Sequence, residues 1–193
     1  MRVSQLGALA IAIAGALPVQ AQDAAAVGQP YVVEGPGRAA CSTYVDQDPA
    51  GDARRLTAAW LTGYLTAHHR LIPDVFDLSA WQSPAVLLSL LTQYCAANPD
   101  QIVEKGAQEL VGYLLPRALT EPAEVIAFET PEGQGVLIYV PVVAQLRTAL
   151  TEAGHPSGPD VPDIIAALRA YQEASGLDPT GLPDQPTLAR LLQ

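Results

Sequence analysis

Apolar residues recur at every third or fourth position between residues 52 and 69, which is the spacing of a helix with one buried face. Asp52 is the expected N-cap of this helix, because aspartate favours the position before the first helical turn. Pro73 lies beyond the expected C-terminal end and would stop the helix. The face that the spacing predicts to be buried consists of Ala53, Leu56, Trp60, Gly63, Tyr64 and Ala67.

Further helices are indicated farther along this part of the chain. Ser83 followed by Pro84 is a cap with proline at the first helical position, and an apolar run follows it. The Asn-Pro pair at 98–99 ends that helix, and another is predicted over residues 100–115. We therefore expect a small helical domain over residues 38–118. The apolar positions of its last helix are Ile102, Val103, Ala107, Leu110, Val111 and Leu114.

The helical spacing stops between residues 119 and 140, where glutamate and proline become frequent. Two short apolar runs, 125–128 and 136–140, flank a Pro-Glu-Gly-Gln-Gly turn and can pair as a β-hairpin. An extended acidic linker is the alternative, and the pattern does not decide between the two. In either case we expect a domain boundary here. The glutamates of this segment are Glu121, Glu124, Glu129 and Glu132.

Helical spacing returns between residues 141 and 193, in three short stretches. Gly154 and Gly176 are expected at the ends of the first two, because glycine suits the C-terminal cap of a helix. Pro186 opens the third stretch. Such short helices build a very small core, which is feasible but marginal. The chain as a whole is therefore predicted to be mainly α-helical, with two small helical domains.

The composition indicates folded material and excludes one large class of partner. Of the 193 residues, 49% are hydrophobic and 16% are charged, so the chain can bury enough apolar surface to offset the entropy of folding. Ten Lys and Arg stand against twenty Asp and Glu, which gives a formal net charge of −10. Because no positive field gathers phosphates, nucleic acid is not expected as a partner.

The first 21 residues have the features of a secretory signal peptide. Arg2 precedes an uncharged apolar run over residues 3–17, and small residues stand before an expected cut after Ala21. This run is shorter than the roughly 20 residues that span a bilayer, so a retained membrane anchor is the less favoured alternative. We expect a periplasmic protein with no membrane span after signal removal, and a flexible leader over residues 22–37.

The chain contains two cysteines, Cys41 and Cys95. In the oxidising compartment that export implies, two cysteines pair more often than they stay free. We therefore predict a disulfide between Cys41 and Cys95. It would close a loop of about 55 residues and stabilise the fold by about 4 kcal/mol in the chain-entropy model.

No residues stand at catalytic or metal-binding spacing. His68 and His69 are adjacent, so on a helix they point about 100 degrees apart, and His155 is distant in the sequence. Neither cysteine has the surroundings of a nucleophile, and no hydrolase, phosphate-binding or dinucleotide-binding motif occurs. The sequence therefore predicts a protein that is not an enzyme, with no cofactor and no metal site.

A Leu-rich helical stretch, the aromatic-Gln pair Tyr171-Gln172 and the turn Gly176-Leu177 follow one another in this order. With this pattern, residues 141–193 resemble the peptidoglycan-binding-like domain that stands beside many cell-wall hydrolases. The resemblance implies a three-helix fold and peptidoglycan as the ligand. The loop over residues 158–163 departs from the family, because it runs into the following helix several residues early. A structural or protein-docking module is the alternative. The matching residues are Val143 to Arg147, Ala149, Leu150, Ala153, Gly154, Ala167 to Gln172, Ser175 to Leu177, Thr180, Gly181, Asp184, Thr187, Leu188, Leu191 and Leu192.

The same resemblance implies ligand contacts at four positions. Tyr171 and Gln172 are expected near the floor of the groove, and Arg147 or Arg169 would face a carboxylate of a peptidoglycan stem peptide. A charge-assisted hydrogen bond from arginine to carboxylate is the strongest contact of this kind. By its helical spacing, Tyr171 is alternatively a core residue.

Between residues 38 and 118, a cysteine followed by an aromatic residue precedes a tryptophan-containing helical stretch, and the second cysteine follows a tyrosine. With this pattern, residues 38–118 are similar to the HdeA/HdeB family of periplasmic acid-stress proteins. The resemblance implies a small helical fold pinned by one disulfide, and a chaperone that exposes apolar surface in acid. An insertion over residues 70–82 and the appended C-terminal domain depart from that family. The matching residues are Cys41, Tyr44, Trp60 to Ala67 and Leu91 to Pro99.

Together these features favour an exported, non-enzymatic protein that binds peptidoglycan through its C-terminal domain. The alternative is an acid-stress holdase for unfolded client proteins, whose C-terminal domain docks protein partners. Below about pH 3 the carboxylates of the chain neutralise and its net charge turns positive. This is weak support for the holdase, because any acidic protein behaves in the same way.

Overall fold

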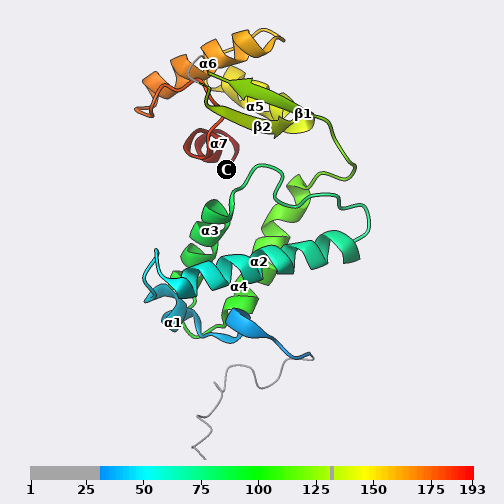
Figure 1. The fold of residues 1–193 in the computed structure, drawn as a ribbon, viewed down its shortest axis with the longest axis vertical. Coiled ribbons are helices and arrows are strands. Elements are labelled where there is room, and N and C mark those ends of the chain that lie inside the picture. The colour runs from blue at the N-terminus through cyan, green and yellow to red at the C-terminus, as the bar shows by residue number, and fades with distance from the viewer. Residues whose placement is uncertain (1–30, 131–132) are drawn as a thin grey trace, which may run out of the picture.

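The described residues form two helical units, each built around its own hydrophobic core (Figure 1). The structure is a computed structural model, and it describes residues 31–130 and 133–193. The signal peptide predicted over residues 1–21 and the leader residues 22–30 lie outside the described residues. Within the described ranges, no helix combines the length and the apolar character that crossing a membrane requires. The mainly helical fold class is confirmed.

The first unit, here called the helical unit, spans residues 31–119. Its long helix α2 lies across α3 and α4, which pack side by side (Figure 1). Its elements are η2 (Gly35–Arg38), α1 (Cys41–Val45), α2 (Asp52–Leu71), α3 (Pro84–Ala97), α4 (Val103–Leu114) and η3 (Leu115–Arg117).

The helices that the sequence predicted after Ser83 and after the Asn-Pro pair at 98–99 are found as α3 and α4. Ser83 is the N-cap of α3, and its hydroxyl accepts a hydrogen bond from the backbone N–H of Val86 at 3.4 Å. Pro84 occupies the first turn, as expected. The apolar positions predicted for the following helix are all buried, although α4 begins at Val103 rather than at residue 100.

The buried face of α2 agrees only in part with the face that the sequence predicted: Trp60 and Tyr64 pack against the core, and the other four predicted residues are exposed. Leu56, expected in the core, is 63% exposed, and the N-cap is Gly51 rather than Asp52. The buried face lies one position farther along and includes polar side chains that hydrogen bond within the unit. The spacing of apolar residues therefore placed the centre of the buried face one position too early along α2. The residues of α2 that are buried are Arg54, Thr57, Leu61 and Leu65.

Residues 31–37, predicted to belong to a flexible leader, instead pack against the helical unit. Val33 is buried, and the Tyr31 hydroxyl donates a hydrogen bond to Glu104 at 2.9 Å. The η2 segment lies against Trp60 so closely that a Cβ at Gly37 would come within 2.4 Å of the indole ring. Residues far along the chain, Trp60 and Glu104, hold this segment in place. The composition of the segment itself could not predict these contacts.

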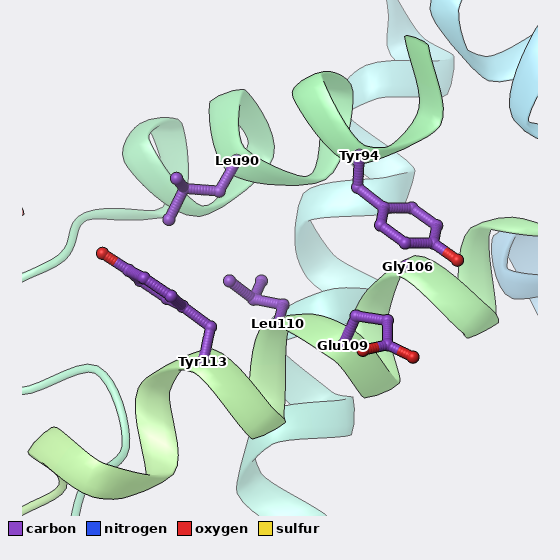
Figure 2. Close-up of a pocket in the computed structure, with 6 residues that line it drawn as sticks. All are labelled: Leu90, Tyr94, Gly106, Glu109, Leu110 and Tyr113. Atoms are coloured by element: carbon purple, nitrogen blue, oxygen red, sulfur yellow. The ribbon is translucent and has the colours of Figure 1, made fainter. Parts of the chain in front are cut away.

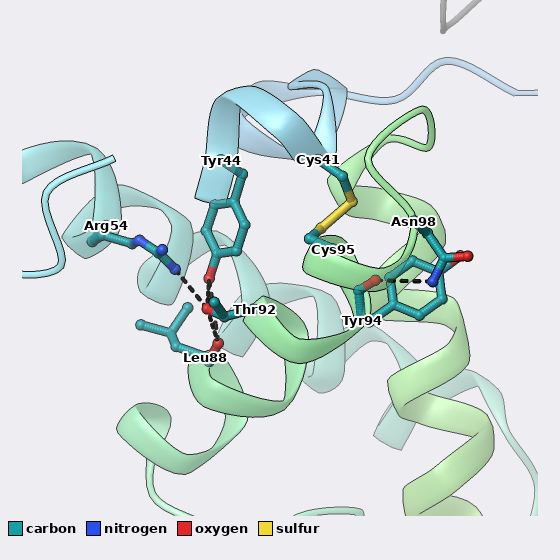
Figure 3. Close-up of a disulfide and its surroundings, with 8 residues drawn as sticks. All are labelled: Cys41, Tyr44, Arg54, Leu88, Thr92, Tyr94, Cys95 and Asn98. Atoms are coloured by element: carbon teal, nitrogen blue, oxygen red, sulfur yellow. Dashed lines mark hydrogen bonds between the residues drawn. A yellow bond between two sulfur atoms is a disulfide. The ribbon is translucent and has the colours of Figure 1, made fainter. Parts of the chain in front are cut away.

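The predicted disulfide between Cys41 and Cys95 is confirmed. Both residues are completely buried, and their Cα atoms are 4.7 Å apart. The bond ties α1 to the C-terminal part of α3 (Figure 3). Since α1 has only five residues, its own hydrogen bonds are too few to hold it as a helix. The covalent link and the core around it therefore keep α1 in place.

The acidic segment forms the hairpin and not the extended linker. Strands β1 (Val125–Glu129) and β2 (Gly135–Tyr139) pair in antiparallel fashion. Phe128 and Ile138 are buried in the second core together with residues of the following helices. The hairpin thus belongs to the second unit, here called the C-terminal unit (residues 125–193).

The rest of the C-terminal unit is helical, and α5 packs against both α6 and α7. The glycines predicted at helix ends are found there: Gly154 and Gly176 have φ angles of 85 and 68 degrees, a conformation that residues with a side chain rarely adopt. The helices are α5 (Val140–Glu152), α6 (Val161–Ala174) and α7 (Gln185–Leu192).

The two units are joined by a segment that the sequence assigned to the helical domain alone. Trp81, from the connection between α2 and α3, is buried in the core of the C-terminal unit. The Gln185 amide nitrogen donates to the Trp81 carbonyl at 2.7 Å, and its oxygen accepts from the Ser83 N–H at 2.7 Å. These contacts hold the start of α7 against the start of α3 (Figure 1).

Candidate functional site

The C-terminal unit contains a buried side-chain amide around which one loop is arranged. Gln172 on α6 is completely inaccessible to solvent. Its nitrogen donates to the Leu182 carbonyl and to the Thr187 hydroxyl, both at 2.9 Å, and its oxygen accepts from the Gly181 N–H at 2.8 Å. Gln172 thereby supplies the partners that the backbone of loop 177–184 does not find in a helix or sheet.

Asp184 extends this network to α7. One carboxylate oxygen accepts from the Thr187 N–H at 3.0 Å, and the other accepts from the Thr180 hydroxyl at 3.1 Å. Aspartate is favoured at a helix N-cap, because it satisfies a backbone N–H that has no partner inside the helix. Since the Gln172 amide also donates to Thr180 at 3.2 Å, one connected network fixes the loop between α6 and α7.

Arg169 lies on α6, one turn before Gln172, and its side chain is exposed. The stem of this side chain passes over Gly181, where a Cβ would be 3.0 Å from Arg169 Cγ. The φ angle of Gly181 is 75 degrees, so both the conformation and the close approach favour glycine there. The structure therefore places an exposed guanidinium beside the loop that Gln172 orders.

The structure places Tyr171 and Gln172 inside the C-terminal unit and not on its surface. Tyr171 is 7% exposed and packs edge-on against His155, with ring centroids 5.8 Å apart. Of the two interpretations of Tyr171, the structure shows the core residue. Gln172 has no accessible surface, so the expectation of a direct ligand contact is corrected: its amide is already bonded within the unit, and it orders the loop.

Arg147 lies on α5 and is half-buried. Its Nε is buried and has no hydrogen-bond partner among the residues that the structure describes. Arg169 and Gln172 both border the loop around Gly181, whereas the side chain of Arg147 makes no ion pair with that loop in the described part of the chain. The four predicted residues therefore form no single surface, and Arg169 is the most accessible of them.

The adjacent histidines at the end of α2 have separate partners. His68 Nδ1 lies 2.9 Å from the Tyr64 carbonyl oxygen, and His69 Nε2 accepts from the Leu78 N–H at 3.1 Å. Over residues 31–130 and 133–193, no three His, Cys, Asp or Glu side chains gather closely enough to hold a metal ion. The two histidines therefore act separately on the local structure.

A buried carboxylate in the helical unit was not among the residues that the sequence singled out. Glu104 on α4 is 2% exposed, and its Oε1 accepts from the hydroxyls of Tyr31 at 2.9 Å and Tyr64 at 3.1 Å. Burial and the neighbouring carboxylate raise the pKa of the Tyr64 phenol, so it stays protonated and keeps donating. A glutamate on an otherwise apolar helix face was the available signal. The cluster joins the N-terminal segment to α2 and α4.

An apolar cleft of about 200 Å³ lies between α3 and α4 (Figure 2). One of the residues that line it is Gly106 on α4, where a Cβ would come within 2.7 Å of the side chains of Leu91 and Tyr94. Glycine therefore lets α4 approach α3 closely at this point. None of the predicted ligand contacts lies in this cleft, whose lining residues are Leu90, Tyr94, Gly106, Glu109, Leu110 and Tyr113.

Comparison with known proteins supports the resemblance of the C-terminal unit. Residues 140–191 match a family model described as a putative peptidoglycan binding domain, and this range includes α5, α6 and all of α7 except its last residue. No curated protein and no solved structure matches the chain. The family match does not extend over residues 38–118, where the HdeA/HdeB resemblance stays a prediction.

Proposed function

We propose that this protein is exported to the periplasm and binds peptidoglycan through its C-terminal unit, without catalysing a reaction. The observation that carries the proposal is the family match over residues 140–191. The disulfide between Cys41 and Cys95 supports an oxidising compartment, which is where peptidoglycan lies and where the apolar N-terminal segment would direct the chain.

The chemistry of the ligand suits the exposed guanidinium of Arg169. Stem peptides of peptidoglycan carry carboxylates, and arginine binds a carboxylate through two parallel N–H bonds. Because Arg169 stands beside a loop that is already ordered by Gln172, binding there needs no rearrangement of the core. We propose Arg169 as the carboxylate contact, with the half-buried Arg147 on α5 as the alternative.

Replacing Arg169 with glutamine is expected to weaken binding to peptidoglycan by about tenfold or more. A hydrogen bond to a charged group contributes about 1.5 to 3 kcal/mol, and 1.4 kcal/mol corresponds to a factor of ten. Glutamine keeps part of the stem that packs over Gly181, so the fold should be retained. The measurement is a binding isotherm from co-sedimentation of purified residues 22–193 with insoluble peptidoglycan at low salt.

Arg70→Gln is the matched control, because it removes the same charge from an exposed position in the helical unit. Its isotherm should equal that of the unaltered protein. If the unaltered protein stays wholly in the supernatant, peptidoglycan binding is wrong. If both variants weaken binding equally, only the net charge matters and the assignment to Arg169 fails.

A further inference from the structure

A buried arginine in the helical unit lacks a carboxylate partner. Arg54 on α2 is 6% exposed. Its guanidinium lies over the ring of Tyr44, 3.9 Å from Cζ to the ring centroid, and Nη1 donates to Thr92 Oγ1 at 2.8 Å (Figure 3). None of the ion pairs in the described part of the chain includes Arg54, and within that part its Nε is buried without a hydrogen-bond partner.

The surrounding residues do not neutralise this cation. The Thr92 hydroxyl donates its own hydrogen to the Leu88 carbonyl at 2.7 Å, so it offers Arg54 a neutral acceptor. Two aspartates close to Arg54 in the sequence have other partners: Asp48 accepts from the Ala50 N–H, and Asp52 pairs with Arg55. Buried charges are normally paired, because leaving one unpaired is costly. The site therefore holds a positioned cation that lacks a counter-charge from its neighbours.

Arg54 forms part of the wall of a cleft of about 480 Å³, here called the Arg54 cleft. Most of the lining comes from one side of α3, whose residues Ala85, Leu88 and Ser89 lie within about one turn of each other. Thr92 and Gln93 add a hydroxyl and an amide one turn farther on. The volume is in the range of small-ligand sites, which are mostly apolar with a few placed polar groups.

We propose that the Arg54 cleft binds a carboxylate carried on a short apolar body. A carboxylate is planar and can accept two N–H bonds from one guanidinium, which supplies the missing counter-charge. Ser89 and Gln93 offer further donors, and Ala85 and Leu88 provide apolar surface for the body of the ligand. The carboxylate can come from a chain end or from an acidic side chain. This site lies in the helical unit and is independent of peptidoglycan binding by the C-terminal unit.

An NMR titration of residues 22–193 that follows the Nε–Hε signal of Arg54 tests this proposal. The probes are N-acetylalanine for a chain-end carboxylate, N-acetylaspartate amide for a side-chain carboxylate, and neutral N-acetylalanine amide. We expect a saturable shift with at least one carboxylate and none with the neutral amide, and the responding carboxylate identifies the source. No saturable shift with either carboxylate, or an equal shift with the neutral amide, overturns the proposal.

Two variants assign the binding to the cleft. Arg54→Lys keeps the charge but loses the two-bond geometry, so the dissociation constant should rise at least tenfold. Because this residue is buried, Ser89→Leu provides a second test: Ser89 is exposed, and leucine fills the cleft while Arg54 stays in place. It should also weaken binding at least tenfold, whereas Thr148→Leu on the exposed face of α5 should not. Unchanged affinity in Ser89→Leu contradicts the assignment.

Discussion

Replacing Gln172 with alanine is expected to lower the stability of the C-terminal unit by about 4 kcal/mol. The substitution leaves the Gly181 N–H and the Leu182 carbonyl without their side-chain partner. Each buried group that loses its only partner costs about 1 to 3 kcal/mol, and the cavity left by the side chain adds to this. The loop between α6 and α7 should lose its order first, because the Gln172 amide hydrogen bonds to three of its residues, Thr180, Gly181 and Leu182.

The size of this effect matters because the C-terminal unit is small. At about 0.05 to 0.15 kcal/mol per residue, the 69 residues from 125 to 193 have a net stability of about 3 to 10 kcal/mol. A loss of about 4 kcal/mol therefore exceeds the whole stability at the lower end of that range and removes somewhat less than half of it at the upper end. We expect Gln172→Ala to lower the midpoint of urea unfolding of the C-terminal unit, and to leave the unit largely unfolded at 25 °C if its stability lies at the lower end of the range.

The two tryptophans allow this expectation to be measured for each unit separately. Trp81 lies in the core of the C-terminal unit, and Trp60 packs against the core of the helical unit. Urea unfolding followed by Trp81 fluorescence, in a Trp60→Phe background, reports on the C-terminal unit. Gln145→Ala is the matched control, because Gln145 is exposed on α5 and its loss should change stability by less than about 0.5 kcal/mol. Equal stability of the two variants would show that the Gln172 network contributes little.

Loss of the disulfide, in the double variant Cys41→Ala with Cys95→Ala, is expected to destabilise the helical unit by about 4 kcal/mol. The bridge closes a loop with a sequence separation of 54, and the chain-entropy model attributes its effect to restriction of the unfolded chain. The structure adds a local effect, because α1 is short and is held to α3 through this bond.

Trp60 fluorescence, in a Trp81→Phe background, measures this loss. The midpoint in urea should fall in the double variant, and reduction of the unaltered protein with dithiothreitol should produce a similar fall. Reduction avoids the cavity that alanine leaves, so agreement between the two assigns the effect to the bond. If neither treatment shifts the midpoint, the core around Cys41 holds the unit without the disulfide.

Local patterns predicted the elements whose stabilising contacts are close in sequence. The glycine caps at residues 154 and 176, the Ser83 cap and the apolar face of α4 follow from short-range rules, and the structure has all of them. The pairing of Cys41 with Cys95 followed from the cysteine content and the expected compartment. Arg169 is exposed on α6, as its position outside the apolar positions of that helix predicts.

Elements whose partners are distant could not be predicted in this way. Arg54 is buried because Thr92, 38 positions later, and the ring of Tyr44 receive its guanidinium. Trp81 joins the C-terminal core because Gln185, 104 positions later, holds its backbone. From the sequence, Gln172 is a polar residue near the end of a helix. Only the folded loop shows that both the nitrogen and the oxygen of its amide form hydrogen bonds within the unit. Hydrophobic periodicity contains no information about such partners.

The most direct test of peptidoglycan binding by the C-terminal unit is amide hydrogen exchange of residues 22–193, with and without saturating soluble peptidoglycan fragments. Bound fragments should slow exchange within residues 140–191, above all near Arg169 and the loop around Gly181. Protection confined to residues 31–119, or no protection anywhere, would contradict the account.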